Sequence, residues 1–320
     1  MISIIILTYN SSWEKLLLTL KSVINQDISL IAEVIVSDDG SSNDNVDLIK
    51  SFFHENNFDR YIINENNTNV GTVKNLLLAS RLAKGKYIKP IGAGDLLFCT
   101  NTIHKAVDFM EENNSKLMFG KMFSYQYKEE LLELPKIYAP RDISPYVEFN
   151  NEQIKRNMFC VGDWISGATL FYERNYLVTQ LSRIESFVIY CEDLIQCLAV
   201  LDGVKISIIN DVVIWYEVGE GISTSKDNLM NERLKQDHIN FFSFVYDSYA
   251  NEKYLNINKI LKSIDRKVSP TVLKKVILKI ANVIFKNRYL TNYPYHAADA
   301  NNGFLSHENI DVFLNDKMKQ

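Results

Sequence analysis

The stretch VIVSDDGSS, residues 34–42, decides the fold class of this chain. Its apolar, β-branched start is typical of a buried strand, and the carboxylates of Asp38 and Asp39 follow at once. An earlier run, IIIL at residues 4–7, passes in the same way into the polar residues TYN at 8–10. Ligands of open α/β sheets bind in the crevice beyond the carboxyl ends of the strands. The two runs therefore predict a site there for a base or sugar with hydrogen-bond donors, or for a metal ion that carries phosphates.

Helical periodicity separates the strand-like runs that follow. After the first strand, apolar residues recur at helical spacing at Trp13, Leu16, Leu17, Leu20, Val23 and Ile24. The predicted elements continue with a strand at 33–37, a helix at 44–53, a strand at 61–63, a helix at 72–83, a strand at 87–91 and a helix at 101–112. Strands that alternate with helices of this length form βαβ units, so we expect an α/β fold with a mainly parallel sheet.

The alternation is less regular beyond residue 120. Apolar runs predict strands at 168–172, 204–209 and 212–216, and a helix at 194–201. We expect the last two strands to form a hairpin that turns at Asn210-Asp211.

Composition and charge are those of an ordinary globular protein. The 320 residues are 47% hydrophobic and 23% charged, and the formal net charge of −4 argues against nucleic acid as a partner. The apolar runs are shorter than the roughly 18 residues of a membrane-spanning helix, and the N-terminus shows no signal-peptide pattern. The four cysteines lack CxxC spacing and suit reduced thiols, so we expect a cytoplasmic protein.

The C-terminal part is basic over residues 253–288, where ten Lys and Arg residues accompany a single acid, Asp265. The same segment contains an apolar stripe at helical spacing, formed by Val272, Leu273, Val276, Ile277, Ile280 and Ile284. A basic amphipathic helix of this kind binds a membrane surface, or else packs on the protein with its basic side in water. The sequence leaves these two alternatives open.

Six short motifs occur in order along residues 1–225. They are SIIILTYN at 3–10, SDDGSSND at 37–44, NVG at 69–71 with Asn75, GKYI at 85–88 with Gly94-Asp95, Glu192-Asp193, and GIST at 221–224. In this order and spacing they resemble the inverting family 2 glycosyltransferases with a GT-A fold. The resemblance implies a GT-A domain over residues 1–225, with a Rossmann-like, mainly parallel sheet and flanking helices, and a helical, basic C-terminal extension over 226–320.

The resemblance assigns the ends of the first two strands to the nucleotide of a donor. It places Thr8, Tyr9 and Asn10 in the wall of the pocket, with the Tyr9 ring on the base, where stacking contributes about 1–3 kcal/mol. Asp39 matches the residue that accepts a hydrogen bond from uracil N3–H, which suits an ionised carboxylate because that group only accepts. Asp38 belongs to the same pocket or to a structural turn.

Further donor-binding candidates come from two other segments of the resemblance. At the start of the helix at 72–83, Gly71 lets the backbone approach the ligand, and Asn75 follows one turn later. Lys74 lies near the nucleotide or on a solvated helix face. The loop that covers the pyrophosphate in the family supplies the last three candidates, Gly221, Ser223 and Thr224.

The cation-binding motif of the family is reduced in this chain. Where the resemblance predicts Asp-x-Asp or Asp-x-Asp-Asp, residues 92–95 read Gly-Ala-Gly-Asp, so that Gly94 and Asp95 remain as donor-binding candidates and Asp95 as the metal ligand. Mg²⁺ and Mn²⁺ commonly bind through one or two carboxylates together with phosphate oxygens and water. We therefore expect Mn²⁺ or Mg²⁺ as cofactor, although the degenerate motif leaves a strict requirement open.

Glu192-Asp193 matches the catalytic pair of the family. We expect Asp193 to be the general base that takes the proton of the acceptor hydroxyl, with Glu192 as the alternative. Without the resemblance, the same pair would be interpreted as acids that stabilise a helix N-terminus. Trp164, in the predicted acceptor-side loop, either stacks on an acceptor sugar or packs in the core.

These features predict a glycosyltransferase that moves a hexosyl or N-acetylhexosaminyl group from a nucleotide-diphosphate sugar, a UDP-sugar, to a glycan. We expect a lipid-linked acceptor, as in bacterial O-antigen or capsule synthesis, at the inner face of the cell membrane. One alternative is a catalytically inactive relative that binds the nucleotide sugar, since acids are missing at positions 92 and 94. A nucleotidyltransferase is disfavoured because residues 8–15 contain no Gly or Arg for a triphosphate-binding loop.

Overall fold

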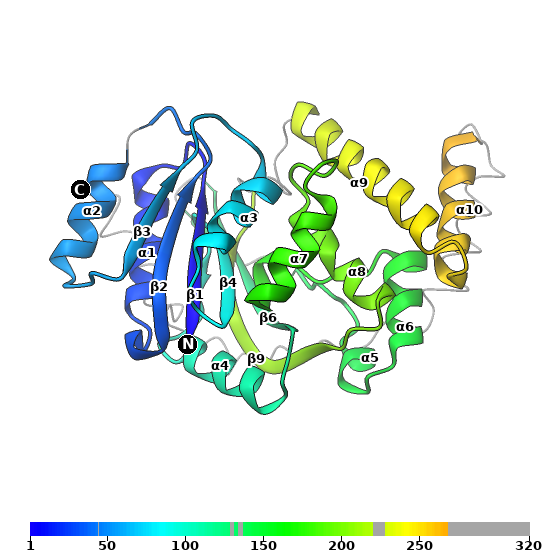
Figure 1. Ribbon diagram of the computed structural model, residues 1–320, viewed down its shortest axis with the longest axis horizontal. Coiled ribbons are helices and arrows are strands. Elements are labelled where there is room, and N and C mark those ends of the chain that lie inside the picture. Colours follow the sequence, from blue (N-terminus) through cyan, green and yellow to red (C-terminus); the bar gives the residue numbers. More distant parts are fainter. Residues whose placement is uncertain (44, 129–130, 134–136, 220–227, 268–320) are drawn as a thin grey trace.

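The computed structural model describes residues 1–43, 45–128, 131–133, 137–219 and 228–267 (Figure 1). Its strands are β1 (Ile2–Thr8), β2 (Ile31–Asp38), β3 (Tyr61–Glu65), β4 (Tyr87–Gly92), β5 (Leu96–Leu97), β6 (Leu117–Lys128), β7 (Leu131–Glu133), β8 (Leu170–Glu173) and β9 (Ile206–Glu217). Its α-helices are α1 (Trp13–Ile24), α2 (Val46–Glu55), α3 (Thr72–Leu82), α4 (Thr102–Glu112), α5 (Ser144–Val147), α6 (Asn151–Arg156), α7 (Arg174–Ile184), α8 (Ile195–Leu201), α9 (Asn228–Ser248) and α10 (Lys253–Lys267).

The strands form a nine-stranded sheet in the order β3-β2-β1-β4-β8-β6-β9-β5, with β7 paired to β6. β1 runs parallel to β2 and β4, and β2 runs parallel to β3, so this half is the parallel unit that the βαβ pattern predicts. β8 is antiparallel to both β4 and β6, whereas β6 and β9 are parallel. The predicted α/β fold with a central sheet and flanking helices is confirmed, and its second half is mixed.

The hairpin predicted at Asn210-Asp211 is wrong, because β9 is one continuous strand. Its register against β6 shifts on either side of Lys121, so the polar pair is accommodated as an irregularity within the strand. Gly120 lies at this shift, where a Cβ atom would come within 2.5 Å of a Val213 methyl group. A residue without a side chain thus lets the two strands stay close, and the chain continues without turning.

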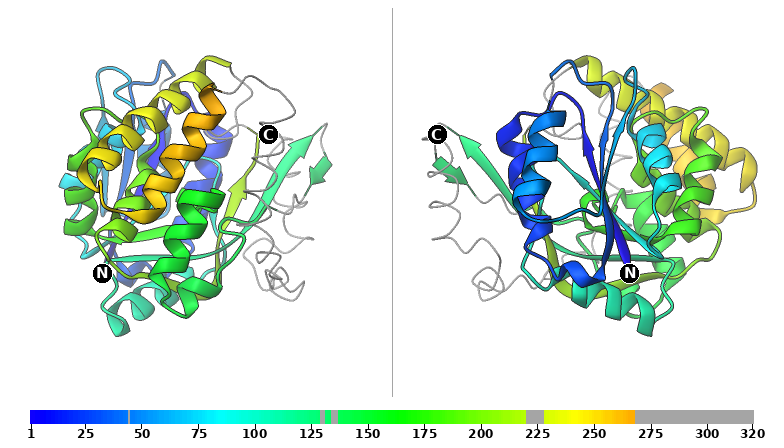
Figure 2. Two further views of the ribbon diagram at one scale, coloured as in Figure 1. Left: turned by 90° about the vertical axis from the view of Figure 1, so that its right-hand side faces the viewer. Right: turned by 60° about the vertical axis from the view of Figure 1, so that its left-hand side comes forward.

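Helices cover both faces of the sheet. α1, α2 and α4 pack on one face, and α3, α7, α8 and α9 on the other, as Figure 1 and the rotated views of Figure 2 show. Side chains alternate along β1, so Ile4 and Ile6 face α1 while Ile5 faces α3, and all three are fully buried. Burying one such side chain contributes about 1.5–3 kcal/mol, so both cores fix the position of β1.

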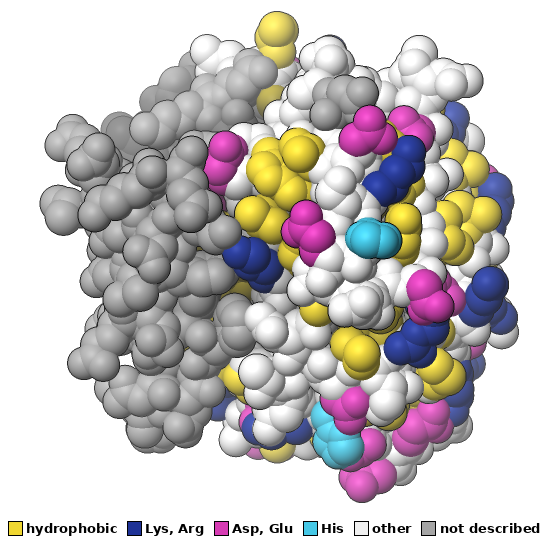
Figure 3. Space-filling view, turned by 90° about the vertical axis from the view of Figure 1, so that its left-hand side faces the viewer, with side chains coloured by type: hydrophobic (Ala, Val, Ile, Leu, Met, Phe, Trp, Pro, Cys, Tyr) yellow, Lys and Arg dark blue, Asp and Glu magenta, His cyan; other side chains and the backbone are white. Residues whose placement is uncertain are grey.

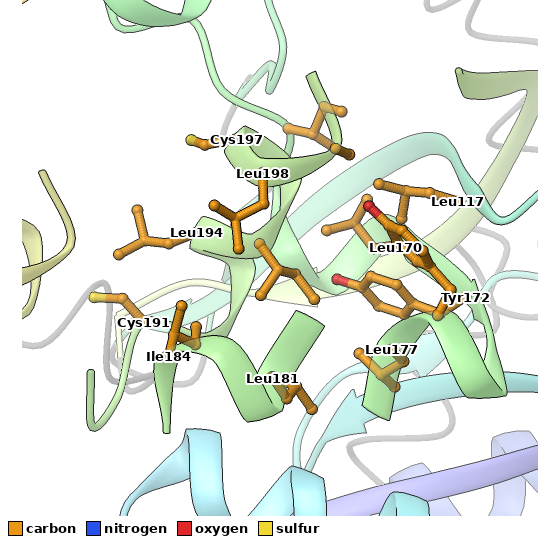
Figure 4. Packing of buried hydrophobic residues seen from close by; sticks show 14 of the residues in the cluster. Leu117, Leu170, Tyr172, Leu177, Leu181, Ile184, Cys191, Leu194, Cys197 and Leu198 are labelled. Atoms are coloured by element: carbon orange, nitrogen blue, oxygen red, sulfur yellow. The ribbon is translucent and has the colours of Figure 1, made fainter. Parts of the chain in front are cut away.

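The core on the α3 side also holds the segment that leads to Glu192-Asp193. Figure 4 shows Leu181 and Ile184 of α7 close to Cys191 and Leu194, and all four are buried. Close packing leaves little room for side chains to shift. The acidic pair is therefore placed by apolar neighbours on both sides of it in the sequence.

The chain changes faces of the sheet next to β1. The helices that follow β1 and β2 lie on one face, and α3, which follows β3 and leads to β4, lies on the other. β1 and β4 are neighbours in the sheet, so the change falls between them. Such switch points of open α/β sheets form a ligand-binding crevice at the carboxyl ends of the strands. In Figure 1 these ends lie opposite the N-terminus.

The described part of the basic segment is a helix that docks on the protein. On α10, Leu255 is 1% exposed, and the Asn258 amide donates a hydrogen bond to the Phe159 carbonyl (2.6 Å). Just before α10, Glu252 pairs with Lys155 (2.8 Å). Docking, one of the two alternatives, therefore holds for this helix, while the apolar stripe at 272–284 lies outside the described residues.

Charges of both signs are mixed on the face over α1 and α2. Figure 3 shows acidic and basic side chains interspersed with uncharged ones on this side, a pattern typical of a solvated surface. Over the residues that the structure describes, no helix combines the length and apolarity needed to span a bilayer.

Candidate active site

The polar residues that follow β1, β2 and β4 lie together at the carboxyl ends of these parallel strands. Thr8 pairs with Asp38 in the parallel ladder. The alignment continues past the strands, where the Asp39 N–H donates to the Thr8 carbonyl (2.9 Å) and the Ala93 N–H donates to the Leu7 carbonyl (3.0 Å). The turns after the three strands are therefore joined by backbone hydrogen bonds.

Asn10 ties the end of β1 to the loop after β2. Its backbone N–H donates to Ser41 Oγ (2.7 Å), and its Oδ1 accepts from the Ser42 N–H (2.8 Å). Its φ of 48° lies in the left-handed region that Asn tolerates better than most residues. The Asp38 carboxylate accepts from the Ser41 N–H (3.0 Å) in the same loop. Tyr9 is 49% exposed beside this loop, which suits the predicted stacking on a base.

A cavity of about 300 Å³ opens at these strand ends. Thr8 and Asp38 line it together with Ser41, Ser42, Asn43, Asn45, Val46, Asp47, Ile49, Ile63 and Glu65. The Thr8 hydroxyl is buried and has no hydrogen-bond partner within the described part of the chain. Such a group costs about 1–3 kcal/mol, and here it belongs to a residue that lines the cavity. The volume is at the lower end for ligand pockets and suits a nucleoside rather than a whole nucleotide sugar.

The Asp39 carboxylate holds the segment that leads into α3. It is 4% exposed and accepts from the Asn66 amide (3.1 Å) and from the backbone N–H groups of Val70 (2.9 Å) and Gly71 (2.9 Å). An ionised carboxylate has about four acceptor positions, so roughly one remains for a ligand. The predicted contact with uracil N3–H stays a prediction, and it is the Asp38 carboxylate, not that of Asp39, that lines the cavity.

Asn75 is committed to internal hydrogen bonds. It is 2% exposed, its Oδ1 accepts from Ser37 Oγ (2.6 Å) and the Asn66 amide (3.0 Å), and its Nδ2 donates to the Ser37 carbonyl (3.1 Å). Its contribution to a donor site is therefore to position the end of β2. Lys74, its neighbour, is exposed on the surface of α3, which fits either alternative stated for it.

Gly71 allows the start of α3 to approach the segment before the acidic pair. Its φ is 87°, and a Cβ atom there would lie 2.3 Å from a methyl carbon of Ile189 and 2.6 Å from the Ile189 carbonyl oxygen. The same carbonyl accepts a hydrogen bond from the Val73 N–H (2.9 Å). The predicted donor-binding helix and the predicted catalytic segment are thus in direct contact through Gly71.

Replacing Gly71 by Ala is expected to destabilise the protein more than replacing Gly203 by Ala. Both positions have a positive φ, which costs about 1–3 kcal/mol for Ala, and the ψ of 157° at Gly71 is one that residues with a Cβ atom rarely combine with it. At Gly203 an added Cβ meets nothing within 4 Å. The contact with Ile189 adds about 1–3 kcal/mol of overpacking at Gly71. Urea unfolding of the two variants measures the difference, and equal losses would show that the Ile189 segment yields without cost.

Gly94 and Asp95 form a turn after β4 that is tied to α1 and to both long strands. The Gly94 N–H donates to Thr19 Oγ1 (2.9 Å), Thr19 Oγ1 donates to the Asp95 carbonyl (2.9 Å), and the Tyr125 hydroxyl donates to the Gly94 carbonyl. The Glu217 N–H donates to Asp95 Oδ1 (2.9 Å). Asp95 is 9% exposed, and burial, with the Glu217 charge adding to it, raises the pKa of Asp95 to about 7.

Lys89 is a buried cation on β4 that the sequence interpretation missed. It is fully buried, its Nζ donates to the Ala168 and Leu170 carbonyls, and it lies over the Phe171 ring. Burial lowers its pKa to about 7, against the opposing effect of the Asp95 charge. The Lys89 ammonium thus connects β4 to the turn that precedes β8.

Asp95 and Glu217 are the carboxylates that fit a divalent cation at this edge. Within the described ranges, no three or more His, Cys, Asp or Glu side chains are grouped so that they could hold a metal ion. Two carboxylates with phosphate oxygens and water nevertheless meet the usual requirement of Mg²⁺ or Mn²⁺. These two residues would therefore hold a cation only where phosphate oxygens and water complete its coordination.

Glu192 and Asp193 lie half-buried in a single helical turn directly before α8. Burial, reinforced by the Asp193 charge, raises the pKa of Glu192 to about 8, and burial raises the pKa of Asp193 to about 6. Near neutral pH the pair therefore holds about one proton. Gly167 lies against it, since a Cβ atom there would be 3.1 Å from Asp193 Cβ and 3.5 Å from Glu192 Oε1. The predicted acceptor-side loop therefore contacts the acidic pair at Gly167, a residue without a side chain.

Asp237 on α9 holds the backbone just before the acidic pair. It is 2% exposed, and its carboxylate accepts from the N–H groups of Ile189 (3.0 Å), Tyr190 (2.6 Å) and Cys191 (3.1 Å). The sequence interpretation missed this residue, although an acid in helical register with the apolar Phe241 was a usable signal. α9 lies beyond the predicted domain boundary at residue 225. It nevertheless contacts the predicted catalytic segment.

Trp164 packs between the acceptor-side loop and α9. Its ring is half-buried and meets those of His238 (6.1 Å between centroids) and Phe242 (6.2 Å) edge to face. This contact agrees with the core alternative, while stacking on an acceptor sugar stays a prediction. The three loop candidates lie outside the described residues, namely Gly221, Ser223 and Thr224.

A family model described as glycosyl transferase family 2 matches residues 3–173, more than half of the chain. The chain belongs to this glycosyltransferase family. The matched segment contains the ends of β1, β2 and β4 and stops before Glu192-Asp193. The predicted membership is thus confirmed on the half of the molecule that holds the cavity.

Known relatives agree with the family and the fold. The uncharacterized glycosyltransferase MG060 homolog of Mycoplasma pneumoniae is 32% identical over 117 residues, 37% of this chain, and the chain spans 39% of the length of that relative. S. aureus TarS 1–349 in complex with UDP gives a TM-score of 0.51 at 18% identity, covering 94% of this chain and 78% of that one. The mannosyltransferase PcManGT of Pyrobaculum calidifontis, in complex with GDP-Man and Mn²⁺, gives 0.55 at 16% identity, covering 89% and 81%. At these identities the two structures show the shared fold alone.

Proposed function

We propose that this family 2 protein is an inverting glycosyltransferase that moves a hexosyl or N-acetylhexosaminyl group from a UDP-sugar to a hydroxyl group of a glycan. The observation that carries the proposal is the half-buried Glu192-Asp193 pair, which lies in the helical turn before α8 with Gly167 against it. Adjacent carboxyl groups whose pKa values are pushed apart are typical of acid–base sites.

The proposed reaction is a single displacement. Asp193 takes the proton of the acceptor hydroxyl while its oxygen attacks the anomeric carbon from the face opposite the nucleotide. A bond forms between that oxygen and the anomeric carbon, and the bond to the diphosphate oxygen breaks, so that the nucleoside diphosphate leaves with the electron pair. A divalent cation held by Asp95 and Glu217 supplies electrostatic stabilisation of the leaving diphosphate when it is bound.

The nucleoside part of the donor is assigned to the cavity at Thr8 and Asp38. Its volume of about 300 Å³ suits a base and ribose, and Tyr9 is exposed next to it. Asp38, the carboxylate that lines this cavity, suits the imide N–H of uracil. The UDP complex of TarS supports this choice, whereas the GDP-Man complex of PcManGT makes guanine the base to test against it.

The acceptor is proposed to be a lipid-linked glycan of cell-surface polysaccharide synthesis, such as O-antigen or capsule. The basic segment that begins with α10 supports a location at the inner face of the cell membrane, where anionic lipids attract Lys and Arg. The alternative of an inactive nucleotide-sugar-binding relative is favoured only by Gly92 and Gly94 at the positions of the missing acids. Retention of Glu192-Asp193 favours an active enzyme.

Thr8→Val is expected to weaken UDP binding without destabilising the free protein. Valine keeps the shape of the side chain and removes a buried hydroxyl that lacks a partner in the described structure, so the ligand-free protein is expected to gain about 1 kcal/mol. Loss of one hydrogen bond to the ligand lowers UDP affinity about 3- to 10-fold. Thermal melting with UDP, GDP and dTDP and their sugars, with and without Mn²⁺, measures both effects.

Thr19→Val is the matched control for this experiment. The Thr19 hydroxyl is fully buried but makes hydrogen bonds with Gly94 and Asp95, so its loss is expected to lower the melting temperature. The UDP assignment fails if only guanine or thymine nucleotides raise the melting temperature of the wild type. A Thr8→Val protein that melts early, like the control, and binds UDP normally would remove Thr8 from the site.

A further inference from the structure

Glu217 occupies the space that a side chain at position 94 would need. An ideal Cβ atom on Gly94 would lie 2.2 Å from Glu217 Oε2 and 3.1 Å from its Cδ. The φ of Gly94, 105°, is one that residues with side chains rarely adopt. The turn after β4 is therefore built without an acid at this position, and a carboxylate from the end of β9 stands there in its place.

Backbone and side-chain contacts hold Glu217 beside Asp95. The Glu217 N–H donates to Asp95 Oδ1 (2.9 Å), which fixes the two residues relative to each other. The Asp95 Oδ2 lies on the side of Gly92, where a Cβ atom would be 3.7 Å away. Two carboxylates from distant parts of the chain thus face one turn at the switch point of the sheet.

Lys15 of α1 balances the charge of Glu217 at the entrance. Its Nζ lies 2.7 Å from Glu217 Oε1, and the two side chains are 26% and 18% exposed. Asp95, at 9%, lies deeper.

We propose that Glu217 supplies the second carboxylate of the divalent-cation site, replacing the acids that the reduced motif at 92–95 lacks. The inference rests on the proposed function, because the cation is the one that accompanies the donor diphosphate. Mg²⁺ and Mn²⁺ are commonly bound by one or two carboxylates plus phosphate oxygens and water, which Asp95, Glu217 and a diphosphate provide. The site is thereby split between the turn after β4 and the end of β9.

The test is calorimetric titration of the full chain with UDP, in EDTA and in Mn²⁺, together with electron paramagnetic resonance of free Mn²⁺ during a Mn²⁺–UDP titration. We expect Mn²⁺ to strengthen UDP binding to the wild type. Glu217→Gln keeps the backbone N–H that bonds Asp95 and removes the charge, so it is expected to lose about tenfold or more of the Mn²⁺-dependent gain. Its UDP affinity in EDTA is expected to stay within about twofold of the wild type.

Gly92→Asp combined with Glu217→Gln is the rescue variant. Position 92 has room for a side chain, with Asp95 Oδ2 at 3.7 Å as its neighbour, so a carboxylate placed there restores a pair at the same turn. We expect the double variant to recover most of the Mn²⁺-dependent gain in UDP affinity. Glu14→Gln, which removes an exposed acid next to Lys15, is the charge-matched control and is expected to behave as the wild type.

Distinct outcomes separate this inference from the proposed function. A wild type that binds no uridine nucleotide in either buffer contradicts the proposed function itself. A wild type that binds UDP equally in EDTA and Mn²⁺, or a Glu217→Gln protein that keeps the full Mn²⁺-dependent gain, overturns the assignment of Glu217 while leaving the nucleotide site intact. If Glu217→Gln alone is poorly folded by melting temperature, failure of the double variant to regain Mn²⁺ binding while folded also overturns it.

Discussion

Asp193→Asn is expected to lower kcat by about 10²- to 10⁴-fold while leaving UDP affinity within about twofold of the wild type. Burial raises the pKa of Asp193 to about 6, so at pH 7 it is mostly ionised and able to take a proton. Burial and the Asp193 charge raise the pKa of Glu192 to about 8, so that carboxyl group is mostly protonated at the same pH. The order of the two pKa values favours Asp193 as the base, and Asn at this position cannot take a proton.

The pH dependence of the wild type provides the second readout of this prediction. A general base must be deprotonated, so kcat/KM is expected to fall as the pH drops through about 6, with a slope of about one proton. For an exposed Asp the same fall would occur near its ordinary pKa of about 3.9. The measurement is release of UDP from a UDP-sugar in the presence of acceptor, between pH 5 and 8. The residual activity of Asp193→Asn is expected to lack this acidic limb.

Glu192→Gln is the matched control for Asp193→Asn. It replaces the neighbouring carboxyl group by an uncharged amide. Because the pKa of Glu192 is raised, this change alters the charge near Asp193 little at pH 7. We therefore expect a smaller loss of kcat, with the acidic limb retained. If Glu192→Gln abolished turnover and Asp193→Asn kept the wild-type rate and pH profile, the base would be Glu192.

The strands β1, β2, β3, β4 and β8 could be predicted from the sequence because their signal is local, whereas no strand was predicted at β5, β6 or β7. β1 and β2 are continuous β-branched runs buried on both faces, and polar residues mark their ends at Thr8 and Asp38. The predicted hairpin at Asn210-Asp211 failed because the same polar signal also marks an irregularity inside a strand. Only the partner strand decides between the two, and here Gly120 of β6 lets β9 continue.

The site could be predicted in part. The sequence motifs identify the residues at the strand ends, but they do not reveal which residues these contact. Thr8 and Asp38 share a cavity, as the two strand ends predict, but the internal hydrogen bonds of Asn75 depend on Ser37 and Asn66, which the motif does not reveal. Glu217 was not among the predicted site residues. Its place beside Asp95 follows from the antiparallel pairing of the short strand β5 with β9, a contact that no local pattern encodes.

Asp237→Asn is the second prediction with a large expected effect, a 10- to 100-fold loss of kcat, about the cost of a misplaced catalytic group. The Asp237 carboxylate accepts three backbone N–H groups from residues 189–191, directly before the catalytic pair. An amide keeps one acceptor oxygen and turns an NH₂ group toward at least one of these donors. The unpaired buried N–H groups cost about 1–3 kcal/mol each, so we also expect a lower free energy of unfolding.

The pKa of Glu192 separates positioning from a general loss of stability. The negative charge of Asp237 contributes to raising that pKa, after burial and the Asp193 charge. Its removal is expected to shift the titration of Glu192 to lower pH, which carboxyl ¹³C NMR measures on the folded variant. Donor binding depends on the ends of β1 and β2, so the Kd for UDP is expected to change much less than kcat.

Asp247→Asn is the control on the same helix. Asp247 lies exposed near the end of α9, away from residues 189–191, so kcat and the titration of Glu192 are expected to stay at wild-type values. If Asp237→Asn behaved like this control, α9 would only cover the catalytic segment. If it lost activity with an unshifted Glu192, the effect would be one of folding. Loss of kcat together with the shift requires that a helix beyond residue 225 places the catalytic carboxylates, so the catalytic unit extends past the boundary that the motifs suggest.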